Sequence, residues 1–471
     1  MLNKTAKQNI LEIDSQDLRK RTLDLASKIT VVNLDGMSDD QKVSHQVINA
    51  IVEEGKKAKS LEELQTKIVF AIKCDILANL DLMKENLYNG YTLLFCQEEE
   101  RCLCFDTRTE LGRAITQPPT NNVTKGPREG FIEGIKANIT LLRKRLKTQE
   151  FKCDYLSVGK YTNTAIAVCY IENIASKITV NKIKQRIKEI SIDGIIDSSY
   201  VSRFLDSGKS FLFKLVGSAE KPDVVTGKLL EGRIAIVVDG SPIVLTVPYM
   251  FVEDLQGPED YYDVPEIASV NRILRAVSAF VCVILPSLYV SLQLYNYQIL
   301  PAKFLISIIN STSTIPFNPL SEMLVILVLF DILREANSRM PSMAGLSLSI
   351  IGAVVLGDAA VRAGLLSAPG VMIGALSGIG LYTMPDNTLL LSILRLAVTV
   401  VGGLMGLLGI ILVSIVLLAH IVSLSAFDVP YTAPYAPSID RDKQDGLIKL
   451  PITRLKNRPA VLKSKNKTRQ R

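Results

Sequence analysis

A long apolar stretch, from about residue 272 to residue 427, constrains this chain more than any other feature. It is rich in glycine and cut by prolines, and it separates a charged N-terminal half from a basic tail. A membrane-spanning helix needs roughly 20 apolar residues to cross about 30 Å of hydrocarbon. We therefore predict a polytopic α-helical membrane domain over 272–427, with candidate spans at residues 274–294, 320–333, 343–366 and 389–424.

The four candidate spans are not equivalent. The segment 320–333 is short and carries charges, so it is the weakest candidate. The segment 389–424 is long enough to tilt, to kink at its glycines or to split into two. Two shorter pieces, 301–312 and 369–384, are bounded by prolines. Each is short for an untilted span, so we expect a re-entrant or interfacial segment, with a shortened crossing as the alternative.

Charge is distributed unevenly along the chain. From Arg272 onward there are 18 Lys+Arg and 9 Asp+Glu, whereas residues 1–271 carry 36 and 38. Residues 440–471 alone hold 11 basic and 3 acidic residues. Such a tail is expected on the cytoplasmic side, against anionic membrane lipid. Nucleic-acid binding is disfavoured because the basic run contains no aromatic residue that could stack on bases.

The N-terminal end is expected to remain in the cytoplasm. Residues 1–24 are polar and charged, and they lack the apolar core of a signal peptide. With both ends on one side of the membrane, the number of crossings must be even, and we expect four. Seven scattered cysteines without a CxxC pair and only two histidines favour buried free thiols in a reducing compartment, with no metal site and no cofactor.

The N-terminal half reads as two small α/β subdomains, over 1–122 and 123–255, followed by a linker over 256–271 and, after the membrane domain, a tail over 428–471. Residues 91–95 and 102–105 are short apolar runs that predict a hairpin. Asp239-Gly240, between two β-branched runs, predicts a second hairpin turn.

Signatures of catalysis are weak. Gly208-Lys209-Ser210 resembles the end of a phosphate-binding loop, but Arg203 stands where the first glycine of that motif is required. No GxSxG elbow occurs, and the two histidines lie far in sequence from any plausible nucleophile. We therefore expect that the chain is not an enzyme.

The informative polar residues lie within the apolar stretch, where ionisable groups are costly and usually face the interior of a helix bundle or water. In a helix over 343–366, one face would carry a pair with i,i+4 spacing, Asp358 and Arg362. This face either lines a water-filled passage or holds a neutralised pair that locks the bundle. The candidate pore-lining residues are Ser347, Ile351, Val355, Asp358 and Arg362.

Small residues define a second pattern in the same stretch, because they allow close approach of neighbouring helices. The candidate helix-packing residues are Gly345, Ser349, Gly352, Gly402, Gly403 and Gly406, and the glycines of the last helix have a gating hinge as their alternative role. A candidate intramembrane charge cluster consists of Glu322, Asp331, Arg334 and Glu335, either at an interface or at a permeation site.

Several motifs resemble the A-subunit family of spore nutrient-germinant receptors, the GerA type of endospore-forming bacteria. The resemblance runs from about residue 120 to 460 and is looser before it. The motifs are GPREGF at 126–131, EKPDVV at 220–225, KLLEGR at 228–233, VDGSP at 238–242 with LTVP at 245–248, PEDYY at 258–262, LREA at 333–336, and PY at 430–431 with APYAP at 433–437.

The resemblance implies a location in the spore inner membrane, with the N-terminal domain and the tail cytoplasmic. It implies a permease-like B subunit and a lipoprotein C subunit as partners, self-association into a homo-oligomer, and contact with membrane lipid but not nucleic acid. The oligomer would be a nutrient-gated ion channel that triggers germination. The alternatives are a sporulation paralogue that works with the dipicolinate-release machinery, and a membrane scaffold that conducts no ions.

Overall fold

The computed structural model describes residues 6–470 except for 14–15, 25–27, 54–60, 69–73, 97–98, 109–124, 207–211 and 340–356. The chain divides into two units. The α/β unit consists of Met1–Tyr249, Ser425–Val429 and Ile452–Arg471, and the helical unit consists of Met250–Leu424 and Pro430–Pro451.

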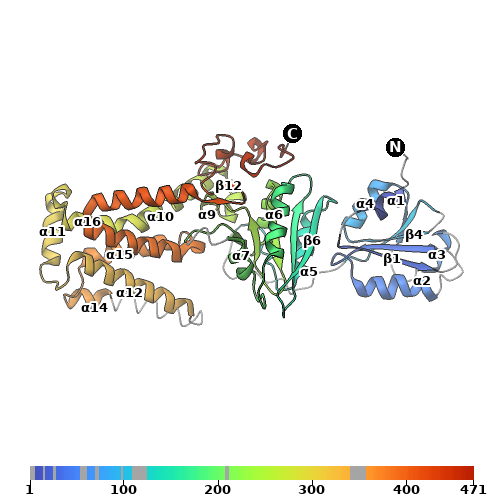
Figure 1. The fold of residues 1–471 in the computed structure, drawn as a ribbon, viewed down its shortest axis with the longest axis horizontal. Helices are drawn as coiled ribbons and strands as arrows, with labels where there is room; N and C mark the ends of the chain where they lie inside the picture. Colours follow the sequence, from blue (N-terminus) through green and yellow to red (C-terminus); the bar gives the residue numbers. More distant parts are fainter. Residues whose placement is uncertain are drawn as a thin grey trace. The chain divides into compact units, whose positions relative to one another are not determined.

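The first subdomain of the α/β unit is a five-stranded antiparallel sheet with the order β1-β2-β4-β5-β3. Helices cover it on both sides, with α4 and α2 on opposite faces (Figure 1). The strands are β1 (Leu18–Asp24), β2 (Lys28–Leu34), β3 (Cys74–Leu77), β4 (Thr92–Cys96) and β5 (Cys102–Phe105). The helices are α1 (Ala6–Leu11), η1 (Lys42–Ile48), α2 (Asn49–Glu53), α3 (Leu61–Ile68) and α4 (Leu80–Tyr88).

This sheet is buried on both faces because apolar residues follow one another along its central strands. Leu94 packs with Val47 and Ile51 on one face, whereas Leu93 and Met83 pack on the other. Successive side chains of a strand point to opposite faces, so a continuous apolar run supplies both cores. The pairing of β4 with β5 confirms the hairpin predicted at 91–105.

The second subdomain repeats this architecture with the strand order β6-β7-β9-β10-β8. Asp239-Gly240 joins β9 to β10 with Gly240 at φ 83°, which confirms the predicted turn. The strands are β6 (Phe151–Val158), β7 (Thr164–Ile171), β8 (Gly217–Ala219), β9 (Ile234–Val238) and β10 (Val244–Val247). The helices are α5 (Ile135–Arg145), α6 (Lys177–Lys188), α7 (Ser198–Asp206) and α8 (Pro222–Glu231).

A buried ion pair joins the two subdomains. Arg143 on α5 and Asp17, which precedes β1, pair with both side chains 1% exposed. The Arg143 guanidinium also stacks over the Phe151 ring at 5.1 Å and donates a hydrogen bond of 3.4 Å to the Phe151 carbonyl oxygen. Removing either partner would leave a buried charge unpaired. The ion pair therefore stabilises the packing of the two subdomains against each other.

The end of the basic tail folds back onto the second subdomain. The backbone N–H of Lys465 donates to the carbonyl of Ile174 at 3.0 Å, and the Ser464 hydroxyl donates to that of Glu231 at 3.0 Å. The segment that the sequence analysis treats as one tail, 428–471, is thus shared between the two units. Residues 452–470 belong to the α/β unit and residues 430–451 to the helical unit.

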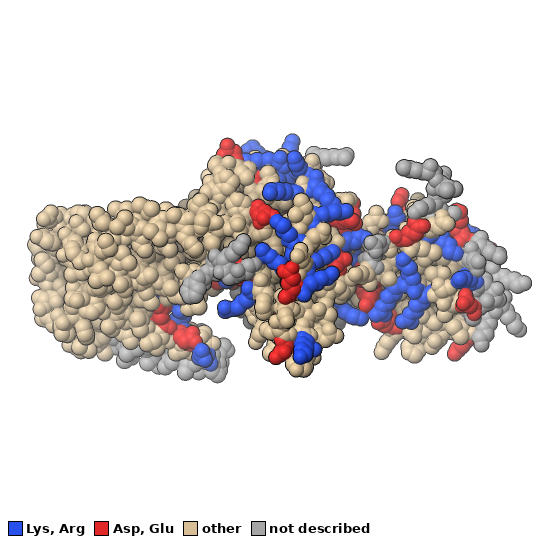
Figure 2. Space-filling view, viewed as in Figure 1, with Lys and Arg blue, Asp and Glu red and all other residues tan. Residues whose placement is uncertain are grey.

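Two helices of the described chain are long and apolar enough to cross a membrane, Pro265–Leu294 and Pro385–Ser423. Much of the apolar side-chain surface of the helical unit is exposed, and Figure 2 shows its outer part almost free of charged residues. The helices are α10 (Pro265–Leu294), α11 (Ala302–Thr312), α12 (Pro319–Arg339), α14 (Gly357–Arg362), α15 (Ala368–Leu381) and α16 (Thr388–Ser423). Short segments α9 (Val252–Leu255), η3 (Pro258–Tyr261), η4 (Tyr297–Ile299) and η6 (Pro385–Asn387) connect them.

Helix α16 is kinked at a glycine, one of the three outcomes expected of this long segment. Gly406 adopts φ 67° and ψ −153° within it, a conformation that favours glycine. The break withdraws nearby carbonyl groups from the helical hydrogen-bond ladder. The Tyr295 hydroxyl compensates, since it lies 3.1 Å from the carbonyl oxygen of Gly403 and 2.9 Å from that of Leu404.

A charged network anchors the start of α10. Arg272, fully buried, donates to Asp260 at 2.9 Å and to Asp445 at 2.9 Å, and Arg275 also pairs with Asp260 at 2.9 Å. Hydrogen bonds from both guanidinium groups and from the Gly257 backbone outweigh burial and lower the pKa of Asp260. The network ties the segment before α10 and the segment after α16 to one helix end.

Candidate functional site

The interior of the helical unit is organised around an ion pair between α12 and α16, in which Arg395 is buried and Asp331 is half-buried. Arg395, whose side chain is fully buried, donates from Nη2 to Asp331 Oδ1 at 2.9 Å. Ser392, almost one turn before Arg395, donates its hydroxyl to Asp331 Oδ2 at 2.5 Å. Arg334 approaches the same carboxylate at 3.4 Å. Asp331 is therefore shared by two guanidinium groups and one hydroxyl.

This cluster reaches two further helices through Ser377 on α15. Arg395 Nη1 donates to the Ser377 hydroxyl oxygen at 3.3 Å, and the Ser377 hydroxyl donates to the carbonyl of Cys282 on α10 at 2.7 Å. Buried polar groups need hydrogen-bond partners, and hydroxyl-bearing side chains supply them in this interior. One connected network thus links α10, α12, α15 and α16.

A stripe of polar and small residues on α16 allows the helices to meet this closely. Apart from the adjacent pair Gly402 and Gly403, its members recur every three or four residues, so they lie on one side of the helix. A methyl group at Gly402 would collide with the Ser287 hydroxyl of α10, and one at Gly403 would come within 2.5 Å of Leu320 on α12. The stripe comprises Ser392, Arg395, Thr399, Gly402, Gly403, Gly406 and Gly409, all buried.

A second buried carboxyl lies at the N-terminus of α15. Glu322, in the first turn of α12, accepts a hydrogen bond of 2.6 Å from the backbone N–H of Ser367, the N-cap residue of α15. The Ser367 hydroxyl in turn accepts from the N–H of Gly370 at 3.0 Å. A carboxylate is stabilised at the positive end of a helix dipole.

The structure divides the charge cluster expected from sequence into three separate sites. Glu322 caps α15, and Asp331 with Arg334 joins Arg395 in the central network. Glu335 instead pairs with Arg339 at 2.7 Å on an exposed face of α12. Helical spacing gave little reason to assign Glu335 and Asp331 to different sites, because residues one turn apart lie on nearly the same face of a helix.

The expected pore face is only partly described. Asp358 and Arg362 lie on α14 and form the predicted i,i+4 ion pair at 2.9 Å, with both side chains exposed in the single chain. Ser347, Ile351 and Val355 lie outside the described residues, as do Gly345, Ser349 and Gly352. Gly208-Lys209-Ser210 also lies outside them.

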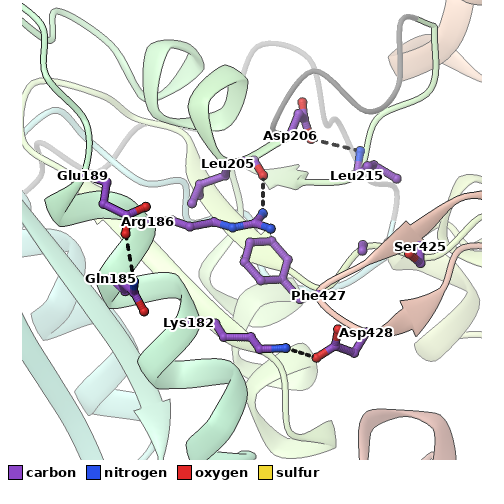
Figure 3. Close-up of a pocket in the computed structure, with 11 residues that line it drawn as sticks. Lys182, Gln185, Arg186, Glu189, Leu205, Asp206, Leu215, Ser425, Phe427 and Asp428 are labelled. Atoms are coloured by element: carbon purple, nitrogen blue, oxygen red, sulfur yellow. Dashed lines mark hydrogen bonds and ion pairs between the residues drawn. The ribbon is translucent and has the colours of Figure 1, made fainter.

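The α/β unit contains a cavity of about 260 Å³ beside α6 and α7, closed on one side by the turn at 425–428 (Figure 3). Arg186 stacks over the Phe427 ring at 4.5 Å and donates to the carbonyl of Leu205 at 2.9 Å. Lys182 forms an ion pair with Asp428, and this hydrogen bond lowers the pKa of the Asp428 carboxyl. Among the charged residues that line the cavity, Lys182 and Asp428 thus pair with each other, and Arg186 contacts a ring and a carbonyl group.

Asp206 lines the same cavity without forming an ion pair to any described residue. Its carboxylate accepts one hydrogen bond of 3.2 Å from the backbone N–H of Leu215. Burial raises the pKa of Asp206 to about 6, because desolvation disfavours the charged form more than this bond favours it.

These two regions differ in what they can do chemically. The described lining of the α/β cavity has no arrangement of nucleophile, base and orienting group, and its strongest feature is a pair of contacts that hold the 425–428 turn. The interior of the helical unit holds charged and hydroxyl groups among apolar helices, a pattern that marks ion or proton passage or specific assembly of a bundle.

Comparison of the whole chain with protein-family profiles identifies its family. The profile described as Bacillus/Clostridium GerA spore germination protein matches residues 4–461. The chain belongs to the GerA family of spore germination proteins. Among its relatives, spore germination protein KA of Bacillus subtilis (strain 168) is 32% identical over 446 residues, covering 94% of this chain and 82% of that protein.

One further relative and one solved structure are also similar to this chain. The uncharacterized membrane protein YfkQ of Bacillus subtilis (strain 168) is 34% identical over 378 residues, covering 80% of this chain and 74% of that protein. The crystal structure of the N-terminal domain of the A subunit of the Bacillus megaterium spore germinant receptor GerK3 covers 52% of this chain and 95% of that chain. Its sequence identity is 27% and its TM-score 0.41.

Sequence reasoning did not place Arg395 among the candidate site residues. It also missed Ser377, Ser392 and Ser367. The sequence did contain one usable signal. At helical spacing, Ser392, Arg395 and Thr399 fall on the same helix face as the glycines that follow them, so this polar and small face could have been predicted. The pairing of Arg395 with Asp331 was not readable, since it depends on which helices become neighbours.

Proposed function

We propose that this chain is the A subunit of a spore germinant receptor, and that its helical unit forms the ion-conducting part of an oligomer opened in response to nutrient. The family membership over residues 4–461 carries the receptor assignment. The buried, charged interior of the bundle supports conduction, because such groups in membrane helices usually line ion or proton pathways.

The proposed setting is the spore inner membrane. Two helices suited to crossing it, α10 and α16, support a membrane location, as does the description of the relative YfkQ as a membrane protein. We propose four crossings, with the α/β unit and the tail on the cytoplasmic side. A permease-like B subunit would sense nutrient, a lipoprotein C subunit would complete the complex, and copies of this chain would surround the pore.

The proposed pore wall includes the pair Asp358–Arg362 together with Ser347, Ile351 and Val355. In the single chain both side chains of the pair are exposed. An exposed ion pair in the apolar part of the chain is costly against lipid but not against water in a pore between subunits. This supports a passage formed by several copies.

Germination assays test the receptor assignment. Spores that lack this chain should fail to germinate with at least one member of a panel of small nutrients, and the wild-type gene should restore the response. Asp358→Ala should change the rate of ion release during germination at a normal protein level, because it removes the charge pair from the proposed wall.

Glu335→Ala serves as the matched control, since it removes another exposed i,i+4 ion pair of the helical unit outside the proposed wall. Its germination rate should equal that of the wild type. If spores without this chain respond to every nutrient at the normal rate, the receptor assignment is wrong. If germination is lost but no variant alters ion release, the chain acts as a scaffold.

A further inference from the structure

The second subdomain carries an excess of positive charge on two of its elements, the end of the tail and helix α6. Residues 452–470 contain seven Lys and Arg residues and no Asp or Glu. Helix α6, Lys177–Lys188, contains five Lys and Arg residues and again no Asp or Glu. Figure 2 shows Lys and Arg side chains gathered over these two elements. The sequence analysis predicts lipid contact for the tail alone, and the structure adds a helix to it.

Hydrogen bonds place the end of the tail beside the start of α6. The backbone N–H of Lys465 donates to the carbonyl oxygen of Ile174 at 3.0 Å, and its ammonium group donates to that of Glu172 at 3.1 Å. Ile174 precedes the first residue of α6 by three positions. The tail and α6 therefore contribute to one surface, which we call the basic surface.

Backbone hydrogen bonds hold the tail in one folded arrangement. The N–H of Arg458 donates to the carbonyl oxygen of Lys467 at 2.9 Å, and that of Arg469 donates to the carbonyl oxygen of Lys456 at 2.8 Å. The Arg458 guanidinium also donates to the carbonyl oxygen of Leu230 on α8 at 2.7 Å. Charges that are already ordered lose less conformational entropy on binding than charges on a flexible segment.

Much of the charge of the basic surface is not neutralised within the described structure. Lys182 pairs with Asp428, and Lys184 pairs with Asp154. No described residue forms an ion pair with six further exposed basic residues, which are Lys177, Lys188, Arg454, Lys456, Lys463 and Lys465. Such a surface attracts a partner that presents many negative charges over a wide area.

We propose that the basic surface docks on the anionic lipid headgroups of the membrane. Each Lys or Arg close to an anionic leaflet strengthens binding by a factor of about five, so six unpaired residues together provide strong attraction. The inference rests on the proposed function, since it takes the chain to be anchored in a membrane by its helical unit.

The path of the chain favours a lipid surface as the partner. Helix α6 holds the turn at 425–428 through the ion pair between Lys182 and Asp428. Asp428 follows Ser423, the last residue of α16, by five positions. Five residues span at most about 18 Å, so a membrane-crossing α16 keeps this contact close to the headgroups.

Exposed apolar side chains on the same two elements favour lipid over nucleic acid. Ile178 on α6 is 69% exposed, and Ile452 in the tail is 61% exposed. Apolar side chains among basic ones suit the boundary between headgroups and acyl chains. Neither α6 nor residues 452–470 contain an aromatic residue that could stack on bases.

Fluorescence of the full chain in nanodiscs tests the docking. Asn181 is exposed on α6 and lies four residues after Lys177, so the two share one helix face. Asn181→Cys is labelled with an environment-sensitive fluorophore, which the seven native cysteines should not take up because they are buried. The emission should shift to shorter wavelength as phosphatidylglycerol replaces phosphatidylcholine. About 1 M sodium chloride should reverse the shift, because the screening length falls to about 3 Å.

Two double variants test the two elements of the basic surface separately. Lys463→Gln with Lys465→Gln removes two charges from the tail, and Lys177→Gln with Lys188→Gln removes two from α6. Each should lower the ratio of docked to undocked chains at a given lipid composition by about 30-fold. Loss of docking in only one of the two double variants would overturn the shared surface.

The control variant changes two exposed lysines at the end of α5 in the same subdomain, Lys144→Gln with Lys147→Gln. Its net charge equals that of the other double variants, and it should dock as the wild type does. All three should unfold at the wild-type temperature, because the replaced side chains are exposed. A label that does not respond to phosphatidylglycerol, or an equal loss in the control, would overturn the proposal. A response to duplex DNA in place of phosphatidylglycerol would assign the surface to nucleic acid instead.

Failure of this inference is distinguishable from failure of the proposed function. A chain whose label responds to anionic lipid but that conducts no ions, alone or with the proposed partner subunits, contradicts conduction and leaves the docking surface standing. A chain that conducts while its label ignores anionic lipid contradicts the docking surface and leaves conduction standing.

Discussion

Both units contain a buried arginine paired with an aspartate, but in different surroundings. In the α/β unit Arg143 meets Asp17, a ring and one carbonyl group, and two of its nitrogens, Nε and Nη1, have no hydrogen-bond partner among the described residues. In the helical unit Arg395 meets Asp331, which also accepts a hydrogen bond from Ser392 and lies 3.4 Å from Arg334.

The difference teaches that burial of a charge pair does not by itself indicate function. The Arg143–Asp17 pair joins residues of the two subdomains with both side chains 1% exposed, so we interpret it as a structural contact between them. The carboxylate of Asp331 accepts hydrogen bonds from Ser392 and Arg395 on α16 and has the Arg334 guanidinium of its own helix 3.4 Å away, so it has more than one neighbouring cation.

The largest expected effect comes from Asp17→Asn, which leaves the Arg143 guanidinium buried without a counter-ion. We expect a loss of about 3–5 kcal/mol from the unfolding free energy of the α/β unit. Denaturant unfolding, followed by hydrogen exchange in the strands of both subdomains, measures it. Asp35→Asn is the control, because Asp35 pairs with Arg19 and Lys136 near the surface and should matter by about 1 kcal/mol or less.

A smaller effect is expected for Asp331→Asn. The amide that this substitution introduces can still accept from Ser392, and Arg395 keeps its bond to Ser377, so we expect a loss of about 2–3 kcal/mol. Thermal unfolding of the helical unit in detergent, followed by hydrogen exchange in α12 and α16, provides the measurement. A loss larger than that for Asp17→Asn would contradict this order, since it would mean that the Asp331 contacts contribute more to stability than the Arg143–Asp17 pair.

The smallest effect concerns Asp206, the half-buried acid of the α/β cavity that forms no ion pair to a described residue. Its pKa of about 6 in the folded state exceeds that of an unfolded Asp, so the folded state binds more protons between about pH 4 and 6. The unfolding free energy of the α/β unit should therefore fall as the pH rises through this window. Urea denaturation at several pH values checks this, and Asp206→Asn should flatten the dependence. An unchanged slope would place Asp206 in an ordinary solvated environment.

Much of the local structure could be predicted from sequence, because local chemistry decides it. The Asp239-Gly240 turn, the strand pair at 92–105 and the Asp358–Arg362 pair depend on residues close in sequence. The kink of α16 was foreseen as one of three outcomes, and Gly406 provides the backbone freedom it needs.

The central contacts could not be predicted, because they join residues distant in sequence. Arg395 and Asp331 are 64 positions apart, and Ser367 and Glu322 are 45 apart. Helical periodicity shows which face is polar but not which helix lies opposite it. The return of the tail to the second subdomain rests on backbone hydrogen bonds such as Lys465 to Ile174, which leave no side-chain pattern in the sequence.

Ion flux through the reconstituted protein tests the central claim most directly. The purified chain is placed in liposomes, alone and together with the proposed B and C subunits, and ion release is followed with nutrient added. The account predicts flux from the wild type in at least one of these assemblies, changed by Asp358→Ala and not by Glu335→Ala. No flux from a correctly assembled complex with nutrient present, or flux that Asp358→Ala leaves unaltered, would contradict a passage lined by this part of the helical unit.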